Sequence, residues 1–206
     1  MFSGIVEATS KIVRTQENQG TVVLTISRPQ DFNDLLPGHS VCVNGVCLTV
    51  EKLSEGEMEF SLAKETLRIT GWTSSNLNGQ EVNLERSLQF GDRVHGHMVT
   101  GHVETVAEVL KKEIFGLSTV ITFNLPNKIK KYLVQKGSVA INGVSLTVNN
   151  VDKGEFSVCL IPETVKRTNL GSLEVGSVVN IEADHFMKMW EHLLMEHKNL
   201  GNTPHA

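Results

Sequence analysis

Aromatic side chains and clustered positive charge are both scarce in this chain. Its 206 residues include one tyrosine and two tryptophans, and 19 lysines and arginines stand against 23 aspartates and glutamates. The basic residues are scattered apart from short pairs such as Lys111-Lys112. Nucleic-acid binding needs a basic patch or groove, and binding of single strands also needs stacking aromatics. We therefore expect no nucleic-acid partner, and the composition argues against a tandem barrel that binds oligonucleotides.

Long hydrophobic runs are also missing. No stretch approaches the roughly 18 apolar residues that a membrane-spanning helix needs. The opening residues Met1-Phe2-Ser3-Gly4-Ile5 do not place a basic segment before an apolar one, as a secretion signal does. We therefore expect no membrane association and a cytoplasmic location.

Cysteine is rare and supplies neither a disulfide framework nor a metal motif. The three cysteines form an odd set without a Cys-x-x-Cys motif: Cys42, Cys47 and Cys159. The first two flank a tight Asn44-Gly45 turn, where a disulfide could be built, but a cytoplasmic chain keeps its thiols reduced. Three histidines fall between residues 95 and 102, yet no set of four partners has the spacing of a zinc site. We therefore expect no metal.

What the chain does contain is one signature written twice. Residues 44–50 read NGVCLTV and residues 142–148 read NGVSLTV. The two copies differ at one position, where the first has the thiol of Cys47 and the second has the hydroxyl of Ser145. Three further pairs recur in the same order: residues 3–7 with 100–104, 65–66 with 163–164, and 82–85 with 179–182. Four landmarks at a nearly constant offset of about 97 residues indicate a duplicated domain.

Each half has the pattern of a small β-barrel. In the first half, short Val-, Ile- and Thr-rich segments predict strands at residues 4–13, 21–27, 40–43, 47–52, 57–63 and 81–85. The Asn-Gly pairs at 44–45 and 142–143 predict tight hairpin turns. Helical segments are expected at residues 31–36 and 127–134, just before each signature. The predicted fold is all-β: two tandem homologous six-stranded antiparallel Greek-key barrels plus a C-terminal α-helix.

The chain divides into three predicted units, residues 1–93, 94–184 and 185–206. The last unit has no counterpart in the first repeat. Its apolar residues recur at three- and four-residue steps: Phe186, Met189, Trp190, Leu193 and Leu194. Asp184 is placed as an N-cap and Gly201 as a stop. The helix either packs on its own barrel or mediates self-association, and the pattern alone does not choose between them.

Two positions could carry chemistry. Strand alternation puts Cys47 and Thr49 on one face, with the same face in the second copy formed by Ser145 and Thr147. Most free cysteines are instead small buried hydrophobes, which is the competing interpretation. His102 occupies the place of Ile5 in the first repeat, and an imidazole can take and return a proton near neutral pH. The alternative for such a histidine is a bond to the backbone of the surrounding Gly-rich run.

Five motifs in this order resemble riboflavin synthase of the α-chain type, over nearly the whole chain. They are residues 1–7 (MFSGIVE), 44–50, 64–68 (KETLR), 83–86 (NLER) and 96–103 (GHMVTGHV). The resemblance implies a dismutation without a cofactor. One 6,7-dimethyl-8-ribityllumazine gives a four-carbon unit to another, which yields riboflavin and 5-amino-6-ribitylaminouracil. It also implies homotrimers formed through the C-terminal helix, with active sites between barrels of different subunits. Lumazine synthase is a further candidate partner.

The resemblance also implies the site residues. The catalytic candidates are Ser40, Cys47 and His102, and Asp184 matches an acidic residue near the helix start. The expected pocket of the first barrel is Gly4, Ile5, Val6, Cys47, Leu48, Thr49, Ser61, Leu62, Ala63, Lys64, Glu65 and Thr66. The expected pocket of the second is Gly101, His102, Val103, Lys136, Ser145, Leu146, Thr147, Leu160, Ile161, Pro162, Glu163, Thr164 and Val165.

A non-catalytic relative is the main alternative. Antenna proteins of the same fold bind a single lumazine or flavin and emit light, and they have typically lost the Gly-His pattern of the second barrel. Gly101-His102, Cys47 and both Glu-Thr pairs are present in this chain, which favours the enzyme.

Overall fold

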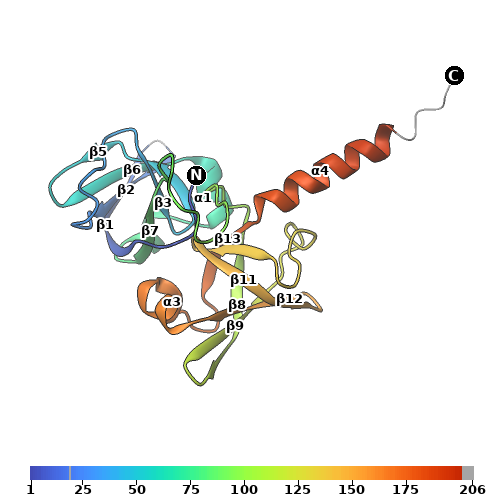
Figure 1. The fold of residues 1–206 in the computed structure, drawn as a ribbon. Coiled ribbons are helices and arrows are strands. Elements are labelled where there is room, and N and C mark those ends of the chain that lie inside the picture. Colours follow the sequence, from blue (N-terminus) through green and yellow to red (C-terminus); the bar gives the residue numbers. More distant parts are fainter. Residues whose placement is uncertain (19, 201–206) are drawn as a thin grey trace.

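The computed structural model describes residues 1–18 and 20–200, with side chains as far as Met195. Its first half is a sheet of short antiparallel strands that curls on itself (Figure 1). In sheet order the strands are β4 (Val46–Thr49), β3 (Ser40–Val43), β7 (Glu81–Arg86), β1 (Ala8–Asn18), β2 (Thr21–Ser27), β6 (Glu57–Leu62) and β5 (Lys52–Leu53). The edge segments β4 and β5 are successive pieces of one stretch of chain, so this stretch links the two edges of the sheet.

The second half repeats this arrangement as a closed barrel. Its strands are β10 (Ser138–Ile141), β11 (Val144–Asp152), β12 (Glu155–Leu160), β9 (Ser118–Asn124), β8 (Thr105–Phe115) and β13 (Val178–Ala183). Strand β11 is continuous where the first half is broken between β4 and β5. The predicted all-β fold of two tandem barrels is confirmed.

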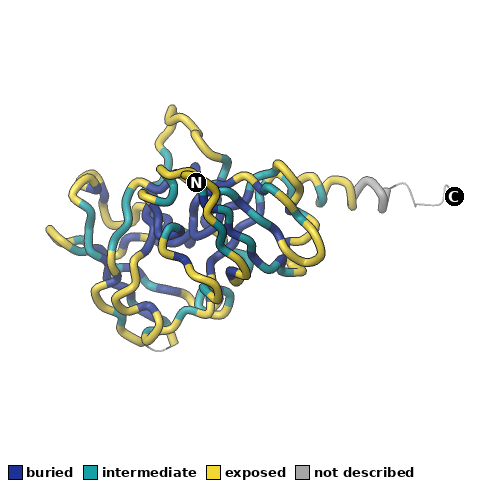
Figure 2. The backbone as a smooth tube through the Cα atoms, turned by 90° about the horizontal axis from the view of Figure 1, so that it is seen from below, coloured by how far each residue is buried: buried dark blue, intermediate teal, exposed yellow. Residues whose placement is uncertain are grey.

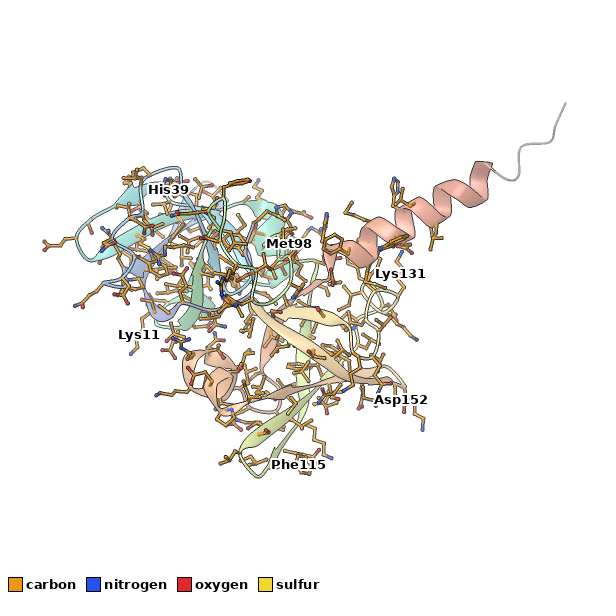
Figure 3. All side chains as sticks on the ribbon, in the orientation of Figure 1. Lys11, His39, Met98, Phe115, Lys131 and Asp152 are labelled. Carbon is orange, nitrogen blue, oxygen red and sulfur yellow. The ribbon has the colours of Figure 1, made fainter. Side chains whose placement is uncertain are left out.

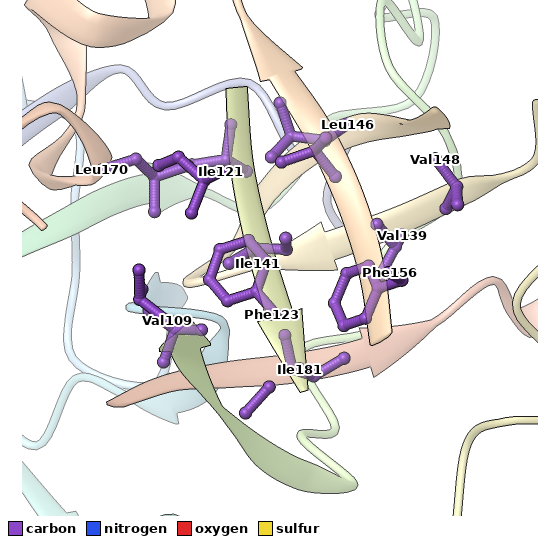
Figure 4. Close-up of a cluster of buried hydrophobic side chains, with 14 of the residues drawn as sticks. Val109, Ile121, Phe123, Val139, Ile141, Leu146, Val148, Phe156, Leu170 and Ile181 are labelled. Carbon is purple, nitrogen blue, oxygen red and sulfur yellow. The ribbon is translucent and has the colours of Figure 1, made fainter. Parts of the chain in front are cut away.

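Each barrel has its own hydrophobic core, and the buried residues gather in the interior of the molecule (Figure 2). The cores form because side chains alternate between the two faces of each strand. Strand β6 shows the alternation plainly, with Met58, Phe60 and Leu62 fully buried. In the second barrel the rings of Phe123 and Phe156 stack with their centroids 5.3 Å apart (Figure 4). These cores hold the strand ends, and therefore the site residues, in fixed positions.

The helices predicted at residues 31–36 and 127–134 are wrong. Both segments form turns with bonds between residues three apart, such as Phe32 N to Pro29 O and Ile129 N to Pro126 O. Phe32 and Ile129 are buried in the cores of their barrels, so each turn packs one side chain into the barrel interior. A short buried turn, and not a helix, therefore precedes each signature hairpin.

Short helices lie instead after the fifth main strand of each barrel. They are α1 (Lys64–Thr70) and α2 (Ser74–Leu77) in the first half, and α3 (Pro162–Arg167) with the 3-10 turn η1 (Asn169–Ser172) in the second. Helix α1 ends at Gly71, whose φ of 68° and N–H bond to Leu67 O form a left-handed cap. The predicted strand at 57–63 consequently ends one residue earlier than expected, at Leu62.

The first seven residues do not belong to a strand of their own barrel. The predicted strand at 4–13 begins too early, since β1 starts at Ala8. We call residues 1–7 the first arm and their repeat counterparts, residues 98–104, the second arm. The arms pair through Phe2 and Val99, whose backbones exchange two hydrogen bonds of 2.8 and 3.0 Å.

Each arm packs on the opposite barrel. Val6 of the first arm belongs to the core of the second barrel, and Val103 of the second arm packs against the core of the first. Each arm is held at its base by a buried glutamate of its own barrel. Glu85 accepts bonds from Ser3 N, Ser3 Oγ and Gly4 N, and Glu182 accepts the equivalent bonds from residues 100 and 101.

Helix α4 (His185–Leu200) projects away from both barrels (Figure 1). Asp184 caps it, because its Oδ1 accepts a bond from Phe186 N at 3.0 Å, as predicted. Ion pairs fasten its first half to the second barrel: Lys188 with Glu104 and Lys131 with Glu191. Its apolar residues are about half exposed or more: Phe186, Met189, Trp190, Leu193, Leu194 and Met195. The predicted stop at Gly201 lies outside the described residues.

The apolar side chains of α4 therefore do not pack on its own barrel in the described part of the chain. This outcome excludes one of the two interpretations of the helix pattern. No helix among residues 1–18 and 20–200 is both long and apolar enough to cross a membrane.

Replacing Glu85 by glutamine tests the anchoring of the first arm. The amide keeps one acceptor oxygen but turns N–H donors toward the arm, where a buried donor then stays unsatisfied. We expect Glu85→Gln to lower the free energy of unfolding by about 1–3 kcal/mol in urea titrations. Glu81→Gln on the same strand is the control, since Glu81 is exposed and bonds only Thr9 Oγ1 through its side chain. Equal stability of the two variants would show that the anchor contributes nothing.

Candidate functional site

The two signature turns have the predicted hairpin geometry. Asn44 and Gly45 have φ values of 44° and 84°, and Asn142 and Gly143 have φ values of 45° and 79°. Positive φ at both central residues is the geometry of a type I′ turn, which Asn-Gly adopts readily. The turns lie against each other between the barrels, since a Cβ on Gly45 would come within 2.9 Å of Gly143 N.

The strand after each turn presents the faces expected from its alternation. In β4, Leu48 is buried, Cys47 is half-buried and Thr49 is exposed. In β11, Leu146 is buried, Ser145 is half-buried and Thr147 is exposed. The prediction is confirmed that Cys47 and Thr49 share one face of their strand, and that Ser145 and Thr147 share the matching face.

The three cysteines are free. Cys42 pairs in register with Cys47 across β3 and β4, but the two side chains differ in environment. Cys42 is buried, and burial together with the nearby Glu85 charge raises the pKa of its thiol well above the usual value. Cys42 therefore stays a neutral thiol at neutral pH, and Cys47 is the thiol that reaches the surface.

The first site forms where the second arm meets β4. Cys47 N donates to Gly101 O at 2.8 Å, and a Cβ on Gly101 would lie 2.5 Å from Cys47 Cβ. His102 follows directly and is exposed, with its backbone N–H bonded to Thr100 Oγ1. Ser40 lies opposite Thr49 in the β3–β4 register. The structure therefore gathers the arm that carries His102 and the strands that carry Ser40 and Cys47 at one place.

The second site is the counterpart on β11. Ser145 N donates to Gly4 O at 2.7 Å, and a Cβ on Gly4 would lie 2.6 Å from Ser145 Cβ. Ile5, the repeat partner of His102, follows and is exposed. The close contact explains the glycine in both arms, since any side chain would collide with the strand.

His97 belongs to this second site, although no role was predicted for it. Its Nδ1 lies 2.7 Å from Ser145 Oγ, and its Nε2 is buried without a hydrogen-bond partner in the described part of the chain. Burial lowers the pKa of the ring, and the charges of Asp184 and Glu182 oppose this shift only in part. His97 is therefore neutral at neutral pH. Because it has no counterpart in the first repeat, the internal comparison could not single it out.

The expected grouping of the arm residues is wrong. Gly4, Ile5 and Val6 were assigned to the first barrel's pocket, but the first arm lies on the second barrel. Gly101, His102 and Val103 likewise lie on the first barrel. Adjacency in sequence suggested that each arm serves its own barrel, whereas the arms cross before they reach a strand.

The other predicted residues fall into two groups. Leu48, Leu62, Leu146 and Leu160 point into the barrel cores, so only their backbones can contact a ligand. The rest lie at or near the surface: Ser61, Ala63, Lys64, Glu65, Thr66, Lys136, Ile161, Pro162, Glu163, Thr164 and Val165.

The paired Glu-Thr motifs lie at the start of short helices. Glu65 forms an ion pair with Arg68 in α1, and Glu163 forms one with Arg167 in α3. Both carboxylates are exposed, so the pairs stabilise the helices little and leave the groups available at the rim. No cluster of three or more metal-ligating side chains occurs among the described residues.

The family model of the lumazine binding domain matches twice, at residues 3–87 and 100–184. The two barrels with matching arm and strand elements are therefore two copies of this domain in one chain. The solved structure of LumP complexed with 6,7-dimethyl-8-(1'-D-ribityl) lumazine is 28% identical with a TM-score of 0.80. That similarity covers 89% of this chain and 99% of the other.

Curated relatives that match this chain over nearly its full length show which family it belongs to. Riboflavin synthase of Escherichia coli (strain K12) is 39% identical and covers 99% of this chain and 98% of that protein. Riboflavin synthase of Photobacterium phosphoreum is 40% identical, covering 96% of this chain and 91% of that protein. This chain belongs to the riboflavin synthase family.

Alanine at Gly101 tests the arm contact at the first site. Gly101→Ala places a methyl group against Cys47 and also strains a backbone with φ of 79°. Gly116→Ala is the control, because Gly116 has φ of 60° but open space around its Cβ position. Strain alone costs about 1–2 kcal/mol, and overpacking typically adds about 1–3 kcal/mol. We expect thermal denaturation to show the larger loss for Gly101→Ala, together with loss of ligand binding; equal losses would contradict a tight arm contact.

Proposed function

We propose that this chain catalyses the dismutation of two molecules of 6,7-dimethyl-8-ribityllumazine to riboflavin and 5-amino-6-ribitylaminouracil. The observation that carries the proposal is the pair of equivalent sites, each built from a signature strand and the arm of the other repeat. A reaction between two identical molecules needs two similar pockets, and the riboflavin synthase relatives match along the whole chain. Binding and orientation of two flat reactants can supply several kcal/mol, up to roughly 7–11 kcal/mol.

The two sites differ in the groups that can move a proton. The first site offers Cys47 and the exposed His102, and the second offers Ser145 with the neutral His97 bonded to it. One lumazine must lose a proton from its 7-methyl group, and the other must accept a nucleophile at C7. His102 serves as the proton shuttle in this proposal, and Ser40, Cys47 and Thr147 bind or deliver small groups.

His97 extends the expected set of residues. An imidazole kept neutral by burial can accept a proton from Ser145 Oγ, which activates the hydroxyl toward an electrophilic carbon. Asp184 lies near enough for its charge to favour the protonated ring, and this is the role we propose for it. The first site has no equivalent pair beside Cys47, because His97 has no counterpart in the first repeat.

The assembly is proposed to be a homotrimer held by α4. Support comes from the helix itself, which projects from the barrels with a row of exposed apolar side chains. Exposed apolar surface of this kind is typical of protein interfaces. Thr49 and His102 of the first site and Ile5 and Thr147 of the second are exposed. The first barrel of one subunit against the second barrel of another would enclose two substrates face to face. Three expectations stay predictions. They are the division into units 1–93, 94–184 and 185–206, the cytoplasmic location, and lumazine synthase as a partner.

Turnover by the purified protein tests the function. Absorbance at the lumazine and riboflavin maxima, without added metal or cofactor, is expected to show one riboflavin for every two lumazines consumed. His102→Gln is expected to reduce the rate by 10²-fold or more, as loss of a general acid–base group does. Cys47→Ser is the comparison and is expected to keep the rate within tenfold, because serine already occupies the matching place at residue 145.

A protein that purifies with bound lumazine and forms no riboflavin would be a carrier like LumP, and the proposed catalysis would be wrong. If His102→Gln turned over lumazine as fast as Cys47→Ser, His102 would not be the proton shuttle.

Alanine replacements on α4 test the assembly. The double variant Trp190→Ala with Leu193→Ala removes two exposed apolar contacts, so the oligomeric mass from light scattering is expected to fall toward that of a monomer. Phe115→Ala is the control, since Phe115 is exposed to a similar degree at the tip of the β8–β9 hairpin, far from α4 (Figure 3). An unchanged mass and unchanged turnover of the double variant would contradict assembly through this helix.

A further inference from the structure

A cleft of about 640 Å³ lies between the barrels, and none of the predicted site residues lines it. Its walls come from both halves of the chain. Gly71 and Trp72 follow α1 of the first half, and Val178 and Asn180 belong to β13 of the second. It is therefore a different place from the two arm sites.

A network of buried asparagines forms the floor of this cleft. Asn83 Nδ2 donates to Asn142 O, and the repeat partner Asn180 donates in the same way to Asn44 O. The backbones of both strands are tied to the turns, because Asn83 N and Asn180 N donate to the side-chain oxygens of the turn asparagines. Up to this point the two halves are symmetric.

The symmetry ends at Asn169. Its backbone N–H donates to Asn83 Oδ1 at 2.8 Å, and Asn83 Nδ2 donates to its side-chain Oδ1 at 2.9 Å. Asn169 thereby presents a donor and an acceptor side by side, and these satisfy the amide of Asn83. Asn83 is 2% exposed, and burial of an unpaired amide there would be costly.

The equivalent partner of Asn180 is absent. Counted from Thr70 and Thr168, the residue that corresponds to Asn169 is Gly71, which has no side chain and ends α1 with a left-handed turn. Asn180 is 4% exposed, and its Oδ1 is not among the fully buried atoms but accepts no hydrogen bond from any residue in the described part of the chain. The unused amide group belongs to a residue that lines the cleft.

The lining sets the chemistry of a ligand. Asn180 has no donor for its Oδ1 and no acceptor for its second Nδ2 hydrogen. In the other half, Asn169 supplies both groups to Asn83 through its backbone N–H and its side-chain Oδ1. Trp72 supplies a large apolar surface beside it. Glu81 is the only ionisable residue among the described residues that line the cleft, so no cation is available to hold a phosphate or carboxylate.

We propose that this cleft is a second ligand site for a small uncharged molecule with an amide or lactam edge, whose N–H and C=O pair with the side-chain amide of Asn180. The ligand takes the place that Asn169 fills in the other half. The site is separate from the two lumazine sites and does not depend on the reaction proposed for them.

Uracil is the probe, since it carries a lactam edge, and 1,3-dimethyluracil is the matched control without an N–H donor. Saturation-transfer NMR on the full-length protein is expected to detect uracil and to give a dissociation constant at least tenfold lower than that of the dimethyl compound. Val178→Phe fills the cleft and is expected to weaken uracil binding at least tenfold. Val175→Phe, at a similarly exposed valine outside the cleft, is expected to leave it unchanged.

Gly71→Asn gives a second variant, because asparagine tolerates positive φ and the Cβ position at Gly71 has open space. It is expected to weaken uracil binding by supplying an internal amide. Lumazine turnover is expected to be unchanged in Val178→Phe, which separates this cleft from the catalytic sites. Absence of uracil binding, equal binding of the dimethyl compound, or equal binding by Val178→Phe would each overturn the proposal.

Discussion

The contact between an arm glycine and a signature strand is the constraint on which the rest of this structure depends. Gly4 O bonds Ser145 N and Gly101 O bonds Cys47 N, so each barrel is completed by backbone from the other repeat. A side chain at either glycine would collide with the strand. Because the contact is reciprocal, neither barrel can shift relative to the other without opening both sites. Duplication therefore produced one two-barrel unit with interdependent sites, and the functional residues follow from where the arms are held.

Polar groups hold that geometry in the interior. Glu85 and Glu182 each accept three bonds from an arm, and four asparagines tie the signature turns to β7 and β13. Burial raises the pKa of Glu85, and the bonds from Ser3 and Gly4 oppose that shift only in part. Apolar residues would pack here at lower cost, but they would not fix the direction in which each arm leaves its barrel. The network therefore contributes specificity of arrangement more than stability.

The sequence predicted what depends on local pattern. The hairpin turns, most strand positions, the faces of Cys47 and Ser145 and the cap at Asp184 all follow from spacing within a few residues. The crossing of the arms could not be predicted this way, because an extended segment has the same local pattern whichever barrel it joins. His97 was missed for a related reason: its proximity to Ser145 is a contact between distant segments, and it has no repeat partner. The segment around Phe32 was predicted as a helix but is a single turn, because its backbone bonds end after one step and the buried Phe32 anchors it to the core.

Three differences between the repeats lie where the two halves meet: Cys47 against Ser145, His102 against Ile5, and Gly71 against Asn169. Differences inside the cores keep the apolar character of the side chains, as where Ile26 and Met58 stand in the place of Phe123 and Phe156. A position inside one barrel must keep an apolar side chain that its own core can accommodate, since a cavity there lowers stability. A position at the junction faces the other repeat or a ligand, so the two copies can change independently once they are joined. Divergence at these positions is the physical route by which one ligand-binding barrel, duplicated, can place unlike chemical groups around two like molecules.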